Sequence, residues 1–169
     1  MYCGGLVSVF ELCQSIQDSP FSTAIRESRL VFPIIEGTHV LTLALSVGTA
    51  MWFDLRLLGL AMRRHTVSET FEYVKPWMLS GFILMFISGG FLFWSQPLRC
   101  YVSGYFLAKM LLLFLAGVNV MAYHLTIDRT RDQWDKAPIP PLQARIAGLL
   151  SLLLWMGVIA AGRIMAYTF

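Results

Sequence analysis

Residues 77–94 read WMLSGFILMFISGGFLFW, a stretch without a single charged side chain, and they decide the fold class. A transmembrane helix needs about 20 mostly apolar residues to cross about 30 Å of hydrocarbon. Inside a bilayer every backbone N–H and C=O must be paired within the protein, which leaves only helices and closed barrels. Because the apolar residues run continuously and do not alternate, this stretch predicts a membrane-spanning helix.

Three more stretches of the 169-residue chain are long and mostly apolar. They extend over residues 33–62, 105–127 and 146–167. The whole chain is 57% hydrophobic and only 14% charged, a balance outside that of soluble globular proteins. The connecting segments 63–76 and 128–143 are too short to fold alone. The sequence therefore predicts an all-α integral membrane four-helix bundle that occupies residues 31–169.

Residues 1–30 form a separate N-terminal segment. Apolar residues recur in it at helical spacing, with polar residues between them: Leu6, Val9, Phe10, Cys13 and Ile16. This pattern predicts a short helix that lies in the membrane interface. The segment has no basic start and Glu11 interrupts its apolar run, so we do not expect a cleaved signal peptide.

Basic residues outside the predicted spans are divided unevenly between the two sides of the membrane. One side has Arg26, Arg29 and Arg99, whereas the other has Arg63, Arg64, Lys75, Arg129, Arg131, Lys136 and Arg145. Because basic loops face the cytoplasm, we expect a multi-pass protein of the bacterial inner membrane with both termini in the periplasm. The net charge of +3 follows from this topology, so no nucleic acid partner is expected.

All three cysteines, Cys3, Cys13 and Cys100, fall on the predicted outer side, where oxidation is permitted. Two readings stay open for them. Cys100 forms a disulfide with the N-terminal segment, or the thiols are unpaired and packed.

Ionisable side chains within the spans are costly in hydrocarbon and are therefore informative. Glu36 and His39 lie one turn apart on the first span and share a face at its outer end. Lys109 lies one turn into the third span from the same side, and Arg163 lies near the end of the fourth. These side chains are expected to converge in the outer half of the bundle.

An imidazole beside an amine in a membrane cavity is a ligand pair for haem iron. A neutral imidazole nitrogen is a good axial ligand, and so is a neutral lysine amine. We expect haem b between His39 and Lys109, with Glu36 near the iron ligands and Arg163 paired with a propionate. The structural alternative has Lys109 reaching to the headgroups, His39 bonded to a backbone carbonyl, and Glu36 paired with Arg163.

A second polar group is predicted at the inner end. Asp54 follows His39, and His124 follows Lys109, by 15 residues each. That interval returns a side chain to within about 60° of the same helix face, roughly 22 Å further along. The group comprises Asp54, Arg56, Asn119 and His124, with His65 just beyond the helix end. It is either a helix-end network facing the cytoplasm or a second haem site, which would need His65 as its other ligand.

Residues 76–94, together with SPFSTAIRESRLVFPIIEGTHVLTLALSVGTAMWFDLRLLGL, YFLAKMLLLFLAGVNVMAYH and ARIAGLLSLLLWMGVIAAGRIMAY, resemble a family of small four-helix bacterial inner-membrane proteins without an assigned function. A more distant resemblance is to the HemJ-type protoporphyrinogen oxidase, through a His on the first span, the LRLL exit, and a Lys followed by Tyr-His on the third. That resemblance implies haem b ligated by His39 and Lys109. The chain departs from that family in the long interval from Lys109 to His124, in Gly162-Arg163, and in having Asp54. CopD-like membrane domains are a looser parallel.

These features predict a membrane cytochrome b-like protein that transfers electrons as a subunit or accessory of a larger membrane complex, with a quinone or a membrane enzyme as redox partner. One alternative is an enzyme, a haem-dependent porphyrinogen or quinol oxidoreductase of HemJ type. Others are a cofactor-free assembly subunit and a copper-handling protein. Whether the chain has catalytic activity of its own stays open.

Overall fold

The structure, a computed structural model, describes residues 8–168, and every regular element in that range is helical. Four helices are long and apolar enough to cross a membrane, which confirms the predicted all-α membrane bundle. In chain order the elements are α1 (Val9–Gln17), α2 (Pro20–Glu27), α3 (Val31–Leu57), α4 (Val67–Ser95), α5 (Pro97–Val102), α6 (Gly104–Ala122), the π-helical turn η1 (Tyr123–Ile127), the 3₁₀ turn η2 (Asp128–Gln133) and α7 (Leu142–Tyr167).

The spans begin and end at recognisable signals. Thr66 and Glu69 form a capping box that starts α4, so this helix begins well before the apolar stretch that identified it. In contrast, α3 ends at Leu57, earlier than the predicted 62, because Gly59 adopts a φ of 71° and turns the chain. At Gly59 an added Cβ would lie 3.3 Å from the Pro138 carbonyl oxygen. The loop after α3 therefore contacts the loop before α7.

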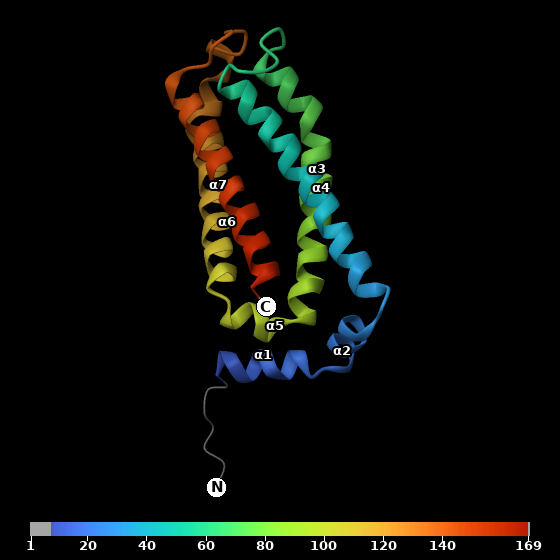
Figure 1. The fold of residues 1–169 in the computed structure, drawn as a ribbon. Helices are drawn as coiled ribbons and strands as arrows, with labels where there is room; N and C mark the ends of the chain where they lie inside the picture. The colour runs from blue at the N-terminus through green and yellow to red at the C-terminus, as the bar shows by residue number, and fades with distance from the viewer. Residues whose placement is uncertain (1–7, 169) are drawn as a thin grey trace.

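The spans pack as two hairpins, α3 with α4 and α6 with α7, and α3 and α7 join the hairpins. Figure 1 shows that α3 and α7, one helix from each hairpin, are close at one end and diverge towards the other. We call the first the loop end, which holds residues 58–66 and 123–141. The second is the capped end, which holds α1, α2, α5 and the C-terminus. One buried cluster at the loop end includes Phe53, Leu57, Val67 and Tyr123, and a second one further along the spans includes Val47, Trp155 and Val158.

Small residues set the closest helix contacts. A Cβ added at Gly81 of α4 would lie 2.8 Å from the backbone nitrogen of Ser46, and one at Gly148 of α7 would lie 3.0 Å from the Asp54 carbonyl oxygen. Only glycine permits such backbone approach, which is typical of membrane helix pairs. These two contacts hold α3 against both of its neighbours.

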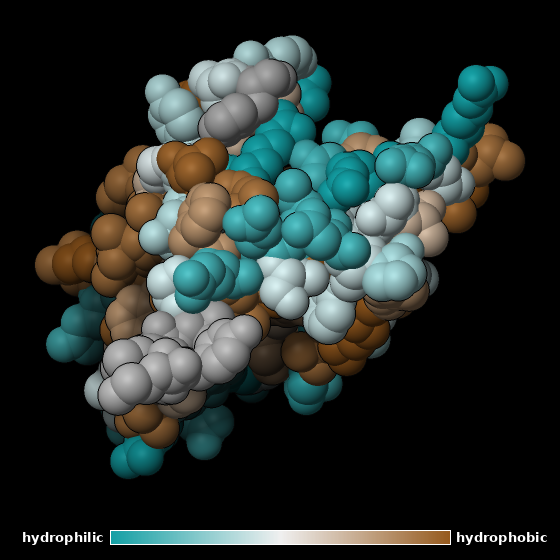
Figure 2. Space-filling model, turned by 90° about the horizontal axis from the view of Figure 1, so that it is seen from below, coloured by the Kyte–Doolittle hydropathy of each residue, from teal (hydrophilic) through white to brown (hydrophobic). Residues whose placement is uncertain are grey.

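The N-terminal segment forms two short helices, α1 and α2, where the sequence predicts one. The chain breaks at Asp18, and Ser19 caps α2, whose first residue is Pro20. The Ser22 hydroxyl is fully buried and donates to the carbonyls of Trp94 and Ser95 at the end of α4. The predicted contribution of Leu6 lies outside the described residues. Figure 2 shows the capped end from outside, with hydrophilic side chains across its centre and hydrophobic ones along its border.

Cys13 of α1 and Cys100 of α5 are both buried and both carry free thiols in the structure, whereas Cys3 lies outside the described residues. α1 packs on α5, and the two thiols are close enough to interact electrostatically. Burial raises the pKa of the Cys100 thiol to about 11. At neutral pH this thiol is therefore protonated and behaves as a packing residue.

Candidate functional site

His39 of α3 turns towards α4 and is half-buried between the two helices. Its Nδ1 lies 3.1 Å from the Met85 carbonyl oxygen and 3.1 Å from the Ser88 hydroxyl. A carbonyl only accepts hydrogen bonds, so the Met85 contact places the ring proton on Nδ1. Nε2 then carries the free lone pair, which is the arrangement found in imidazoles that bind a metal.

Glycine lies directly beside this ring. A Cβ added at Gly89 of α4 would lie 3.1 Å from His39 Cε1, a separation tighter than ordinary packing allows. The small residues at Ser88 and Gly89 therefore make room for the imidazole and fix its orientation.

Lys109 of α6 lies on the facing hairpin and is also half-buried. Its side chain runs along Gly162 of α7, where an added Cβ would lie 3.7 Å from Nζ. The ammonium group is close enough to His39 and to Cys100 to interact with both electrostatically. Among the described residues no carboxylate pairs with Lys109 and no acceptor takes a hydrogen bond from it. The structure thus places the two predicted ligands within electrostatic range of each other, on different hairpins.

Glu36 and Arg163 lie at the same end but are exposed side chains. The Arg163 guanidinium carbon lies 4.9 Å from the centre of the Tyr167 ring, a cation–π contact within α7. Within residues 8–168 no ion pair joins Glu36 to Arg163, so the ion pair expected in the structural alternative is not formed. Both side chains remain free to meet another group.

The second predicted group surrounds a cavity of about 300 Å³ near the loop end, and all four spans line it. Asp54 is only 6% exposed, and its Oδ2 has no hydrogen-bond partner in the described part of the chain. Asn119 donates to the Ala147 carbonyl oxygen over 3.0 Å. His124 Nδ1 lies 3.0 Å from Asp128 Oδ2. Three of the four predicted residues, Asp54, Asn119 and His124, therefore share one cavity.

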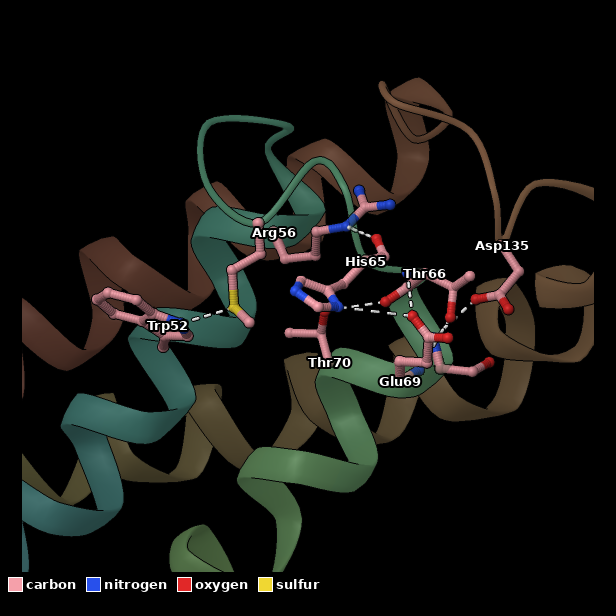
Figure 3. A network of polar contacts seen from close by, with 9 residues as sticks. Trp52, Arg56, His65, Thr66, Glu69, Thr70 and Asp135 are labelled. Carbon is pink, nitrogen blue, oxygen red and sulfur yellow. Dashed lines mark hydrogen bonds and ion pairs between the residues drawn. The ribbon is translucent and has the colours of Figure 1, made fainter.

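The inclusion of Arg56 in this group is wrong. Arg56 follows Asp54 by two residues, so the Arg56 side chain leaves α3 about 200° further round the helix and points away from the cavity. Figure 3 shows the guanidinium directed at the loops of this end. Nε donates to the His65 carbonyl oxygen over 3.0 Å, and one terminal nitrogen donates to the Ala137 carbonyl oxygen over 3.1 Å. Arg56 is fully buried and is a structural residue that ties the two loops to α3.

His65 does not line the cavity either. Its Nδ1 lies 3.8 Å from Glu69 Oε2, and both side chains are about half exposed at the surface of the loop end. A second haem at His124 would therefore lack the other histidine that the sequence offered for it.

Sequence reasoning missed several residues of the cavity wall. Ser151 of α7 lies beside the Asp54 carboxyl, and the rings of Phe71, Phe82 and Trp155 form the apolar walls. A signal existed for α7, because Ala144, Ala147, Gly148 and Ser151 are small residues at helical spacing and mark a contact face. For the aromatic residues the sequence held no comparable signal, since such residues are common throughout the spans.

Comparison with known proteins supports one of the resemblances. No curated protein and no solved structure matches the chain, so the HemJ-type and CopD-like parallels gain no support. A family model does match, over residues 31–168, which is all four spans. The chain belongs to the family of unknown function DUF6644.

Proposed function

We propose that this protein is a membrane cytochrome b-like protein that transfers electrons through a haem b held by His39 and Lys109 at the capped end. The observation that carries the proposal is the state of the His39 ring. Its Nδ1 is bound to the Met85 carbonyl oxygen, which leaves Nε2 for iron, and Lys109 lies close by without a carboxylate to hold its proton.

The surroundings of the two residues fit a planar cofactor. Each candidate ligand is accompanied by a glycine on a neighbouring helix, Gly89 beside His39 and Gly162 beside Lys109. The ligands come from different hairpins, and α3 diverges from α7 towards this end (Figure 1). Both features support a flat group beside the two ligands.

When bound, haem b would supply one-electron redox chemistry. The protein's own residues do the rest. The Met85 carbonyl and Ser88 orient the imidazole, and Arg163, exposed at the same end, is available to donate to a propionate. Glu36 lies one turn before His39 and is the nearest carboxylate on that helix face.

Location and partners follow from the charge pattern and the apolar surface. The basic loops assign the loop end to the cytoplasm and the capped end to the periplasm of a bacterial inner membrane. All four spans expose large apolar side chains, among them Leu41, Ile83, Phe114 and Leu153, which require lipid or another membrane protein as neighbour. As part of the proposal, the protein serves as a subunit or accessory of a larger redox complex.

The test is the difference spectrum, reduced minus oxidised, of detergent-purified protein made with ample haem supply. We expect the α-band of a b-type cytochrome, lost or shifted in His39→Ala and in Lys109→Ala. His65→Ala and Lys75→Ala are matched controls, because they change the same residue types at the loop end. A featureless spectrum, or bands that survive both ligand substitutions, contradicts the haem site.

A cofactor-free assembly subunit is the second candidate, and one observation favours it. The hydrogen bond from His39 to Met85 also joins α3 to α4 without any ligand. On that reading the wild-type protein has a featureless spectrum, and His39→Ala destabilises the α3–α4 hairpin without changing the spectrum. A haem enzyme of porphyrinogen or quinol oxidoreductase type is distinguished from an electron carrier by turnover of its substrate.

A further inference from the structure

The cavity near the loop end has the properties of a ligand site that the haem proposal does not use. Its volume of about 300 Å³ lies at the lower bound of small-molecule pockets, about 300 to 1,000 Å³. Aromatic and aliphatic side chains make up most of its lining, including Phe71, Phe82 and Trp155. A cavity of this kind selects a flat, mostly apolar molecule.

A few polar groups converge on this apolar space. Asp54 presents a buried oxygen without a hydrogen-bond partner, and leaving such a group unsatisfied costs free energy unless a ligand meets it. Ser151 lies beside that carboxyl, and the Asn119 amide is held in place by the Ala147 carbonyl oxygen. The polar groups of α3, α6 and α7 thus face one small volume.

His124 lies at the edge of the cavity nearest the loops. Asp128 accepts a hydrogen bond from its Nδ1, which leaves Nε2 as an acceptor. Tyr123 and His124 belong to the π-helical turn η1 at the end of α6. Such turns are uncommon and occur frequently at functional sites, because the extra residue changes the direction of the side chains.

The mouth of the cavity faces the bilayer. Leu79 of α4 and Val120 of α6 both line the cavity, yet they are 49% and 46% exposed on the outer surface of the spans. A ligand that passes between these residues arrives from the hydrocarbon. It is therefore lipophilic, with a ring small enough for the cavity and a chain that can remain in the membrane.

We propose that this cavity binds the head group of a membrane quinone. A quinone ring is flat and apolar, with two oxygens on opposite edges. Protonated Asp54 or Ser151 can donate to one oxygen, and in the quinol form the second hydroxyl can donate to His124 Nε2. A phospholipid phosphate fits less well, because the buried acidic group is Asp54 and the nearby cation, Lys75, lies 3.5 Å from Glu72. The quinone site does not depend on the haem site. If both are present, a quinol at the loop end is the electron donor and the haem lies at the capped end.

The test uses the full-length protein in detergent, titrated with a decyl-substituted benzoquinone and, separately, a decyl-substituted naphthoquinone. Quinones quench indole fluorescence, and Trp155 lines the cavity. We expect quenching that saturates and that is much smaller in Trp155→Phe. A decyl chain without a quinone ring is added as competitor, and it should not displace the quinone.

Two substitutions and one control decide the outcome. Asp54→Leu should weaken binding about tenfold through loss of its hydrogen bond. Val120→Phe narrows the mouth from an exposed position, so folding is kept and binding should fall. Asp132→Asn changes an exposed carboxylate of the same end and should bind as the wild type does. Non-saturating quenching, equal affinity in all variants, or displacement by the bare chain overturns the proposal.

The same titration of His39→Ala separates the two proposals. Quinone binding should persist in His39→Ala although its haem spectrum is lost. Quinone binding by wild-type protein that shows no haem spectrum contradicts only the haem site. A b-type spectrum in protein that binds no quinone contradicts only this inference.

Discussion

The two ends of the bundle are built differently. At the loop end α3, α4, α6 and α7 meet around a buried cluster that includes Phe53 and Leu57, and Arg56 connects the loops above it. At the capped end α3 diverges from α7, and ionisable side chains such as Glu36 and Arg163 stay exposed. The contrast indicates that the loop end supplies most of the stability, whereas the capped end keeps polar groups available for a ligand.

Arg56→Met tests the stabilising role of the loop end and should have the largest effect. It leaves the partly buried carbonyls of His65 and Ala137 without their donor, and lost hydrogen bonds to a charged group cost about 3 kcal/mol in total. Thermal unfolding in detergent should show a large loss of stability. Arg64→Met, which changes an exposed arginine nearby, should have almost no effect. Equal stability of both variants would remove the proposed difference between the ends.

Substitutions of two glycines compare the ends directly. Gly148→Ala adds a methyl group 3.0 Å from a backbone oxygen of α3, so overpacking should destabilise the fold by about 1 to 3 kcal/mol. Gly89→Ala meets a side chain, the His39 ring, which can move.

We therefore expect Gly89→Ala to keep its unfolding temperature and to shift the haem spectrum, and Gly148→Ala to do the reverse. The two variants are measured by thermal unfolding and by the difference spectrum. If Gly89→Ala unfolds as readily as Gly148→Ala, the capped end is packed as tightly as the loop end.

The pH dependence of Cys100 sharpens the description of the capped end. Its pKa is raised from 9.0 to about 11, so between these values the thiol ionises in the unfolded chain but not in the folded one. Folding stability is therefore unaffected below pH 9 and falls as pH rises through this range.

Maleimide labelling of Cys100, in a Cys3→Ser, Cys13→Ser background, should be slow at pH 8 and accelerate about tenfold per pH unit as thiolate forms. Unfolded protein of the same variant is the control and should label rapidly at pH 8. Rapid labelling of the folded protein would show that α1 does not cover α5 in detergent.

The helix caps should give the smallest effect. Thr66→Ala removes the cap of α4, and loss of such a cap costs about 1 kcal/mol. Ser8→Ala removes the cap of α1, a short helix outside the bundle, so global unfolding should be unchanged. Thermal unfolding distinguishes the two variants. A comparable loss for Ser8→Ala would mean that the capped end unfolds together with the rest.

Much of the fold could be predicted because hydrocarbon permits so few structures. The uncharged run 77–94 required a helix, and the other spans followed from the same rule. The end of α3 at Leu57 was missed, since Leu58 to Met62 are as apolar as a helix but Gly59 takes a left-handed conformation. The break between α1 and α2 had a local signal in Ser19-Pro20.

The site was predictable where depth and helical spacing determine position. Those two rules predict His39 and Lys109 at one depth and Asp54, Asn119 and His124 at another, and the structure lines one cavity with the latter three. They do not give the direction of a long side chain near a helix end, where several partners compete. Arg56 was assigned to the wrong group for that reason, because the loop carbonyls that bind it come from residues whose position depends on the complete fold.

The hydrogen bonds of Arg56 also have a consequence for biogenesis. One of its acceptors, Ala137, is synthesised 81 residues later, after the residues of α4 and α6. Until then the guanidinium lacks this partner. Closure of the loop end is thus a late event of assembly, and nascent chains that stop before Ala137 should remain accessible to proteases between α3 and α4.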